Sequence, residues 1–300
     1  MLAIPVVLLA VSAAQAVNIL MGNDDGWATS NIRAMFNALD EAGHNVVLSS
    51  PAIGMSGTSS TDLPPVPVLF GCQFGSCPPL SPAQGFNASD PRLNYVNSFP
   101  VTAFKYGLST LAPKFFAPSG KPDLVVSGPN VGDNIGIIND VFSGTLGVAC
   151  AGARAGIPSI GFSGVSGEKV SYTTLPNAYS GVYASLAAAF VEHVLAKGAT
   201  PLLRAGVALN VNYPPVDKEG GCTQPKYVLS RQTLAVPWGT RDLEICGNGG
   251  RLPKEQDVMD AKGCWASVTV LDMDSKFDVG ADLQGKVVDI LGDLLVCLPK

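Results

Sequence analysis

Residues 19–27, ILMGNDDGW, join a short apolar run to two adjacent aspartates and a glycine. The first four residues suit a buried strand, and the Asn, Asp and Gly that follow are the usual turn residues. A turn alone does not require a second aspartate, and two neighbouring carboxylates repel each other. A divalent cation held by Asp24 and Asp25 would remove that repulsion. The surrounding sequence has to decide between a plain turn and a cation site.

Short apolar runs alternate with longer amphipathic stretches as far as residue 213. We predict strands at 17–21, 45–48, 123–127, 158–162 and 207–211, and helices at 32–42, 101–111, 145–155 and 175–196. This alternation is typical of an α/β fold, a mainly parallel sheet with helices on both faces. Residues 62–100 are rich in Pro, Gly and Asn and offer short strands at most.

The alternation stops after residue 213. Strands are predicted at 227–230 and 266–270, and an apolar helix at 283–295. We interpret residues 214–300 as a β-rich and helical C-terminal extension packed on a core of residues 17–213, within one domain of residues 17–300.

The first sixteen residues, MLAIPVVLLAVSAAQA, form an apolar run that ends in a small-x-small pattern. This pattern predicts a secretory signal cleaved after Ala16, and hence a secreted protein. The run is short for a membrane span. A buried N-terminal strand and a membrane anchor are the alternatives.

The cysteines agree with export. Seven are present: Cys72 and Cys77 flank QFGS and could close a small loop, and Cys150 lies in a small-residue helix as the candidate for a buried, unpaired thiol. Apart from Cys150, the six remaining cysteines allow several disulfide connectivities, among which the sequence does not choose. Paired CxxC spacing for zinc is missing. The sequon at Asn87 is a candidate glycan site.

The net charge of −5 leaves no basic tract for a nucleic-acid polymer, and nothing marks a membrane surface after signal removal. A protein of this charge that handles anions must attract them locally, with a metal ion or with helix N-termini.

Polar stretches follow three of the predicted strands: GNDDGW (22–27), SSPAIGMSGTSS (49–60) and SGPNVGDNIG (127–136). Parallel sheets bind ligands at the carboxyl ends of their strands, so these stretches are expected to face one crevice. They contain the candidate ligands Asp24, Asp25, Ser56 and Asn130. Oxygen donors suit Mg²⁺ or Mn²⁺, with Ca²⁺ as a further choice. Gly26 would let consecutive carboxylates turn to one point.

A fourth stretch, FSGT (142–145), opens the small-residue helix predicted at 145–155. Ser143, Gly144 and Thr145 offer backbone N–H groups, two hydroxyls and the positive end of a helix dipole, which together suit a phosphate. A metal beside a phosphate site indicates hydrolysis of phosphate esters.

Simpler interpretations stand beside these. Ser143 could be only an N-cap, and Asn130 only a cap or turn residue. His44 and His193 are expected to be structural. A serine-hydrolase GxSxG elbow, a GxGxxG dinucleotide loop and a Walker A lysine motif are all missing from the sequence.

NDDG, the Ser-Gly at 56–57, SGPNVGDNIG and FSGT, in this order, resemble the SurE family of metal-dependent phosphatases, which includes acid phosphatases and 5′/3′-nucleotidases. The similarity spans about residues 17–213 and includes GIPSIGFS (156–163) and ALNVNYP (208–214). It implies a Rossmann-like three-layer αβα core and a homodimer or homotetramer. It further implies that Asp24, Asp25, Ser56 and Asn130 bind the metal, and that Asn134, Ser143, Gly144 and Thr145 bind the phosphate.

The predicted function is therefore a metal-dependent phosphomonoesterase acting on small substrates such as nucleoside monophosphates. Asp24, Asp25, Asn134 and Ser143 would form the catalytic set, with a metal-activated water as nucleophile or, alternatively, a covalent phosphate on Asp24. A non-catalytic phosphate- or sugar-binding protein and an exopolyphosphatase or phosphodiesterase are the other hypotheses. Departures from bacterial members at Thr102 and Ala151 bear on nucleotide preference. Asp133 is expected to face solvent or to reach the cation through water.

Overall fold

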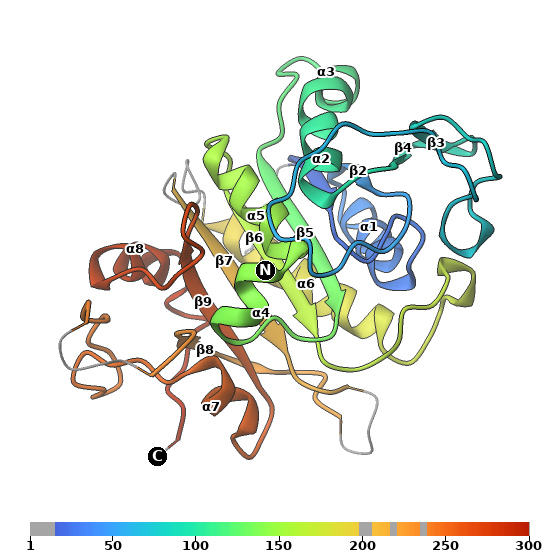
Figure 1. Cartoon of the computed structure of the whole chain (residues 1–300). Helices are drawn as coiled ribbons and strands as arrows, with labels where there is room; N and C mark the ends of the chain where they lie inside the picture. Colours follow the sequence, from blue (N-terminus) through green and yellow to red (C-terminus); the bar gives the residue numbers. More distant parts are fainter. Residues whose placement is uncertain (1–15, 198–205, 217–220, 235–238, 300) are drawn as a thin grey trace, which may run out of the picture.

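The computed structural model describes residues 16–197, 206–216, 221–234 and 239–299. Within these ranges, nine strands form one sheet in the order β3-β4-β2-β1-β5-β6-β7-β9-β8 (Figure 1). Neighbours from β4 to β7 pair in parallel, β3 and β9 run antiparallel to β4 and β7, and β8 is parallel to β9. The predicted signal lies outside the described residues, apart from Ala16.

The elements have the following bounds. The strands are β1 (Asn18–Gly22), β2 (Asn45–Pro51), β3 (Gln84–Asn87), β4 (Asp90–Val96), β5 (Leu124–Val131), β6 (Ser159–Gly164), β7 (Val207–Tyr213), β8 (Lys226–Ser230) and β9 (Trp265–Asp272). The helices are α1 (Ser30–Glu41), α2 (Pro100–Tyr106), α3 (Ala112–Phe115), α4 (Gly136–Phe142), α5 (Gly144–Arg154), α6 (Ser180–Ala196), α7 (Glu255–Asp260) and α8 (Ala281–Leu291). Short turns of 3-10 or π helix are η1 (Gln73–Gly75), η2 (Gly107–Leu111) and η3 (Tyr172–Thr174).

Helices cover both faces of the sheet, as the sequence predicted. Alternate residues of a strand point to opposite faces, and β1 divides accordingly: Ile19 and Met21 pack in the layer of α1 and α6, whereas Leu20 packs in the layer of α2, α3 and α5. All three side chains are at most 1% exposed. Burial of each side chain contributes about 1.5–3 kcal/mol to stability. The run is continuously apolar because both faces of β1 are covered.

Helix α1 follows its predicted pattern. Ile32, Met35, Phe36 and Leu39 are buried, and the chain leaves the helix at Gly43 in the left-handed region with φ +93°. Glycine adopts that conformation without steric cost, so it ends the helix.

Several predicted boundaries were wrong. The helix expected over 101–111 consists of α2 and the π turn η2 and continues into α3. The chain passes close to the sheet at Gly107, where a Cβ would lie 2.8 Å from Leu20 Cδ1. Helix α6 begins at Ser180 rather than at 175. Pro176 disfavours helix at the residue before it, and Asn177 Oδ1 accepts from Ser180 N at 2.8 Å.

The sequence offered short strands at most in residues 62–100 and predicted no helix between 127 and 145. Residues 62–100 contain the β3–β4 hairpin, and β4 joins the sheet beside β2. Strand β5 continues beyond 127 to Val131 beside β6, with a register shift, and α4 follows it. Asn130 therefore lies within a strand end rather than in a loop.

Three disulfides join Cys72 to Cys77, Cys222 to Cys264 and Cys246 to Cys297. The small 72–77 loop and the unpaired Cys150 are thus confirmed. Burial raises the pKa of the Cys150 thiol to about 11, so it stays protonated and unreactive.

The strands of the predicted extension widen the same sheet, since β9 pairs with β7 and β8 with β9 at the end opposite β3 (Figure 1). The division of the domain at residue 213 into a core and a C-terminal extension stays a prediction.

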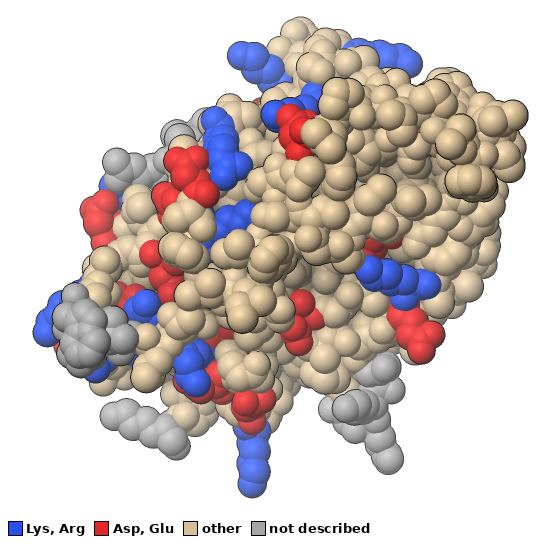
Figure 2. Space-filling model, viewed as in Figure 1, with Lys and Arg blue, Asp and Glu red and all other residues tan. Residues whose placement is uncertain are grey.

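Figure 2 shows acidic and basic side chains interspersed over this C-terminal end, with no continuous basic stripe among the described residues on this face. No single helix of the described ranges is long and apolar enough to cross a membrane, and the bent pair α4–α5 meets that criterion only by combined length and composition.

Candidate active site

Asp24 lies just beyond the end of β1, at the N-terminus of α5. Its Oδ2 accepts from Gly144 N at 3.0 Å, and its Oδ1 accepts from Thr145 Oγ1 at 2.9 Å. The residue is only 3% exposed. A negative charge at this position is favoured by the unpaired N–H groups and the dipole of the helix. Asp24 is thus held by neutral donors.

Asp25 is completely buried and turns toward β5 and the loop that follows β6. Its Oδ2 accepts from Val131 N at 2.7 Å, and its Oδ1 lies 2.7 Å from Lys169 Nζ. Burial is the main cause that raises the pKa of Asp25 to about 6; the charge of Asp24 adds to it, and the ammonium of Lys169 opposes it. Gly26 has φ +96°, a backbone conformation that other residues rarely adopt, and a Cβ there would lie 3.2 Å from the backbone carbonyl carbon of Ile53, so this turn favours glycine.

Asn130 and Ser56 lie beside these carboxylates. Thr145 Oγ1, which donates to Asp24, is 3.4 Å from Asn130 Oδ1, while Asn130 Nδ2 donates to Gly132 O at 2.9 Å. Lys169 Nζ, which contacts Asp25, also donates to Ser56 Oγ at 2.7 Å. Thr145 therefore links two of the predicted ligands and Lys169 links the other two. These contacts bring all four together at or beyond the ends of β1, β2 and β5, and we call this group of residues, with the N-terminus of α5, the crevice.

The backbone before Asn130 depends on one glycine. Gly128 has φ +94°, and a Cβ at this position would lie 2.2 Å from the carbonyl oxygen of Phe162. Only glycine fits there. The register of β5 on β6 shifts between Ser127 and Asn130, which places Asn130 beside Ser163 at the strand end.

The donor set fits a hard divalent cation. It consists of two carboxylates, one hydroxyl and one amide oxygen, which Mg²⁺, Mn²⁺ and Ca²⁺ accept. This set contains only two carboxylates, and nowhere among the described residues are three or more His, Cys, Asp or Glu side chains arranged to hold a metal. A soft-metal site of the zinc type is therefore not found among these residues.

The predicted phosphate residues lie at the start of α5. Ser143 Oγ accepts from Leu146 N at 3.0 Å, so Ser143 is an N-cap, as the simpler interpretation held. The Gly144 N–H and the Thr145 hydroxyl contact the Asp24 carboxylate. A Cβ on Gly144 would lie 2.7 Å from Asp24 Cβ, so the close approach of helix and aspartate needs glycine. These two donors therefore bind the two oxygens of one carboxylate.

Asn134 is buried in a network of polar side chains beside β6 and β7. Its Nδ2 donates to Ser163 Oγ at 2.8 Å, its backbone N–H donates to Asn212 Oδ1 at 2.8 Å, and its carbonyl accepts from Asn210 and Asn212. Since Ser163 pairs with Asn130, Asn134 lies at the same sheet edge as the other candidates.

Sequence reasoning missed two lysines. Lys169 contacts Asp25 and Ser56, as described above. Lys276, in the loop after β9, is 3% exposed, and its Nζ donates to Val141 O at 3.0 Å, Ser59 Oγ at 3.1 Å and Ser143 O at 3.3 Å. Burial lowers the pKa of Lys276. Neither lysine belongs to a motif, so no local signal identified them.

A pair of buried carboxylates ties α4 to the C-terminal segment. Asn210 Nδ2 donates to Glu255 Oε1 at 2.9 Å and to Asp140 Oδ1 at 3.3 Å, and Glu255 Oε2 accepts from Gly136 N at 2.8 Å. Gln232 Nε2 donates to Asp140 Oδ2. Burial raises the pKa of Glu255 to about 7 and that of Asp140 well above its usual value.

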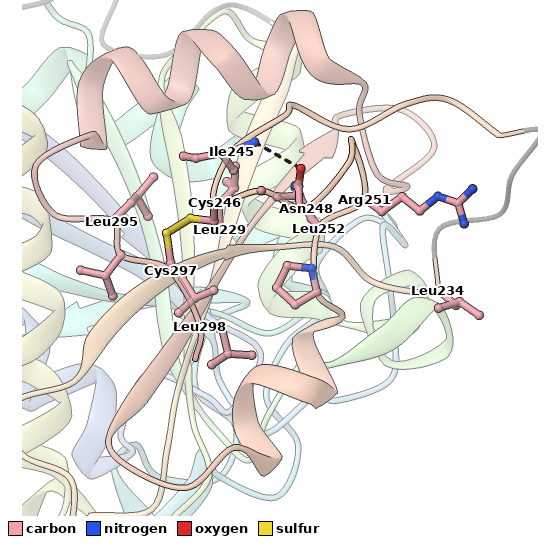
Figure 3. Close-up of a pocket in the computed structure, with 14 residues that line it drawn as sticks. Leu229, Leu234, Ile245, Cys246, Asn248, Arg251, Leu252, Leu295, Cys297 and Leu298 are labelled. Carbon is pink, nitrogen blue, oxygen red and sulfur yellow. Dashed lines mark hydrogen bonds between the residues drawn. A yellow bond between two sulfur atoms is a disulfide. The ribbon is translucent and has the colours of Figure 1, made fainter. Parts of the chain in front are cut away.

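The remaining candidates lie outside this crevice or at its surface. Asp133 is exposed. His44 is buried against Glu192, and His193 pairs with Asp293 at 3.2 Å, so both histidines join elements of the fold as expected. An apolar cavity of about 490 Å³ is a separate feature (Figure 3). Its lining includes Leu229, Ile245, Leu252, Leu295 and the Cys246–Cys297 disulfide, and none of the predicted site residues.

The fold and the crevice define a class: an α/β protein with buried acidic and amide oxygens at the carboxyl edge of a parallel sheet, facing a helix N-terminus. Comparison with known proteins identifies the family. The sequence model of Survival protein SurE matches residues 19–233. The chain belongs to the SurE family.

Individual relatives agree. The chain is 35% identical over 285 residues to an acid phosphatase of Yarrowia lipolytica, covering 85% of this chain and 79% of the relative. It is 34% identical to the 5′-nucleotidase SurE of Lawsonia intracellularis, covering 67% of each chain. The crystal structure of the SurE protein from Aquifex aeolicus superposes with a TM-score of 0.56 at 24% identity, over 86% of this chain and 94% of that one. That likeness shows the fold, which confirms the predicted Rossmann-like α/β class.

Proposed function

We propose that this protein is a metal-dependent phosphomonoesterase whose active site is the crevice of Asp24, Asp25, Ser56 and Asn130. The enzyme class rests on membership of the SurE family and on relatives named acid phosphatase and 5′-nucleotidase. One observation carries the site: two buried, adjacent carboxylates share a crevice with Ser56, Asn130 and the N-terminus of α5.

Asp24, Asp25, Ser56 and Asn130 would hold Mg²⁺ or Mn²⁺, or alternatively Ca²⁺, through oxygen atoms. When bound, the ion would polarise the phosphoryl group and lower the pKa of a water molecule. The near-complete burial of both carboxylates supports this role, because a buried pair of like charges is costly unless a cation compensates it.

The chain's own donors would bind the phosphoryl oxygens. At the start of α5, the Gly144 N–H donates to one carboxylate oxygen of Asp24 and the Thr145 hydroxyl to the other, and Ser143 caps the same helix. Preorganised donors of this kind stabilise the negative charge that develops on a transferred phosphoryl group. Asn134, fixed by Ser163 and Asn212, would add polar contacts at the far side of the crevice.

Small phosphate monoesters such as nucleoside monophosphates are the proposed substrates. Of the two positions that depart from bacterial members, Thr102 donates to Asp62 at 2.8 Å, and Ala151 packs in the α2–α3–α5 layer. We propose that the protein is secreted, which the three disulfides support. Asn87 lies at the β3–β4 turn, where a glycan would project from the hairpin. A homodimer or homotetramer is the proposed assembly.

The test is phosphate release from an aryl phosphate and from nucleoside monophosphates, with Mn²⁺ or Mg²⁺ and with chelator. We expect metal-dependent release that falls about 100-fold or more in Asp24→Asn, because the variant loses a charge at the reacting centre. Asp289→Asn, an exposed aspartate of α8, is the matched control and should match the wild type. Thermal unfolding of both variants verifies that they fold.

Each hypothesis has its own outcome. Tight phosphate binding without release would identify a binding protein and overturn the catalytic proposal. Release that survives chelation and the Asp24→Asn change would place the chemistry elsewhere. Cyclic nucleotides and polyphosphate in the same assay test the phosphodiesterase and exopolyphosphatase alternatives.

A further inference from the structure

Lys169 reaches the buried carboxylates from an exposed loop. Its side chain is 37% exposed, whereas that of Asp25 is 0% exposed, and its ammonium lies 2.7 Å from Asp25 Oδ1 and 2.7 Å from Ser56 Oγ. The second oxygen of Asp25 is occupied by the Val131 N–H. The lysine therefore contacts the carboxylate oxygen of Asp25 that does not accept from the Val131 N–H, together with the hydroxyl of Ser56.

The backbone around Lys169 is fixed on both sides. Val170 O accepts from Ser30 N at 2.9 Å, and the backbone of Glu168 both donates to and accepts from Tyr179 Oη, at 3.2 and 3.0 Å. Among the described residues, the lysine side chain in contrast makes polar contacts only to Asp25 and Ser56. Its long aliphatic stem can therefore turn toward solvent without moving the loop.

The charges of the crevice show what the ammonium does. Asp24 is held by the neutral donors Gly144 and Thr145, and Lys276 interacts with it only electrostatically. Among the described residues, Lys169 is therefore the cation in direct contact with the two aspartates. It supplies one positive charge to two adjacent acidic groups. A divalent ion on the same oxygens would supply two, and both cannot occupy Asp25 Oδ1 and Ser56 Oγ at once.

We propose that Lys169 is a built-in competitor of the divalent cation: its ammonium pairs with Asp25 and Ser56 in the metal-free protein and must leave when the metal binds. This inference rests on the metal site of the proposed function. It makes Lys169 a residue that sets metal affinity. In the metal-free protein, the lysine keeps Asp25 and Ser56 together.

Mn²⁺ binding measured by titration calorimetry at pH 7 tests this proposal without an activity assay. Lys169→Met keeps the stem and removes the charge, so we expect the Kd for Mn²⁺ to fall on the order of 10-fold, the factor that corresponds to one hydrogen bond to a charged group. Lys169→Arg, which keeps the charge, should stay close to the wild type. The melting temperature in chelator should fall in Lys169→Met and be largely retained in Lys169→Arg.

Lys105→Met is the matched control, because it removes the same charge from a surface ion pair with Asp62 outside the crevice; its Mn²⁺ affinity should be unchanged. Unchanged or weaker Mn²⁺ binding in Lys169→Met would overturn the proposal while leaving the metal site intact. A wild-type protein that binds no Mn²⁺ would instead overturn the proposed metal site and this inference together.

Discussion

Glu255 allows the sharpest quantitative prediction, because it is a fully buried acid at a point where α4 meets the C-terminal segment. Its carboxylate accepts from Asn210 Nδ2 at 2.9 Å and from Gly136 N at 2.8 Å. Burial is the largest cause of the shift that raises its pKa from 4.5 to about 7, and the charge of Asp278 adds to it. The substitution Glu255→Gln keeps the shape and an accepting oxygen but cannot ionise.

The sign of the pH effect follows from these two values. Between pH 4.5 and about 7 the unfolded chain releases the Glu255 proton while the folded protein retains it, so the stability that the protonated acid confers is complete below pH 4.5 and is lost as pH rises toward 7. At roughly 1.4 kcal/mol per pKa unit, the loss is about 3 kcal/mol. Asp140, which shares the Asn210 donor, titrates in both proteins, but the negative charge of Glu255 helps to raise its pKa, and Glu255→Gln removes that contribution.

Urea unfolding of the wild type and of Glu255→Gln in chelator, at pH values from 4 to 8, measures this difference. We expect the free energy of unfolding of the variant to rise relative to the wild type by about 3 kcal/mol between pH 4.5 and 7 and to stay level above that. Titrating groups that do not interact with Glu255, Asp25 included, are present in both proteins and cancel, whereas Asp140 does not cancel completely because its pKa depends on the charge of Glu255. A difference that is constant with pH would refute the reasoning, and an opposite slope would mean that Glu255 is ionised and stabilised in the folded protein.

Two further predictions concern backbone and disulfides. Gly128→Ala places a Cβ 2.2 Å from the Phe162 carbonyl oxygen at a φ of +94°, so we expect the free energy of unfolding to fall by about 3 kcal/mol or more in chemical unfolding. Gly43→Ala, with φ +93° but open space around it, should lower it by only about 1 kcal/mol. Similar losses in both variants would contradict the steric argument. Replacing Cys246 and Cys297 together by Ser opens a link between residues 51 apart and should lower the free energy of unfolding by about 2–4 kcal/mol, and an unchanged value would show that the segment is held by its packing alone.

Much of the fold could be predicted because its signals are local. The continuous apolar run of β1 and the spacing of Ile32, Met35 and Phe36 in α1 are each contained in one short stretch. The elements that were missed depend on partners. Strand β4 carries Asp90, Pro91 and Arg92, which disfavour a strand, and forms because β2 offers it a pairing edge.

The candidate site was predictable for a related reason. Parallel strands end at one edge of a sheet, so polar stretches after successive strands must meet there. The structure gathers Asp24, Asp25, Ser56 and Asn130 accordingly, although Asn130 belongs to the end of β5 and Ser143 serves as an N-cap. Their functional roles stay a prediction until the metal and activity measurements are made.

By itself, the sequence determined the layered α/β plan and the polar edge of the sheet, since hydrophobic periodicity and strand-end motifs are properties of neighbouring residues. Only the tertiary structure decided that Lys169 would contact Ser56, 113 positions away, and that Glu255 would contact Gly136, 119 positions away. The physical reason is that the burial and pairing of a charge depend on how distant segments pack, which no local pattern encodes.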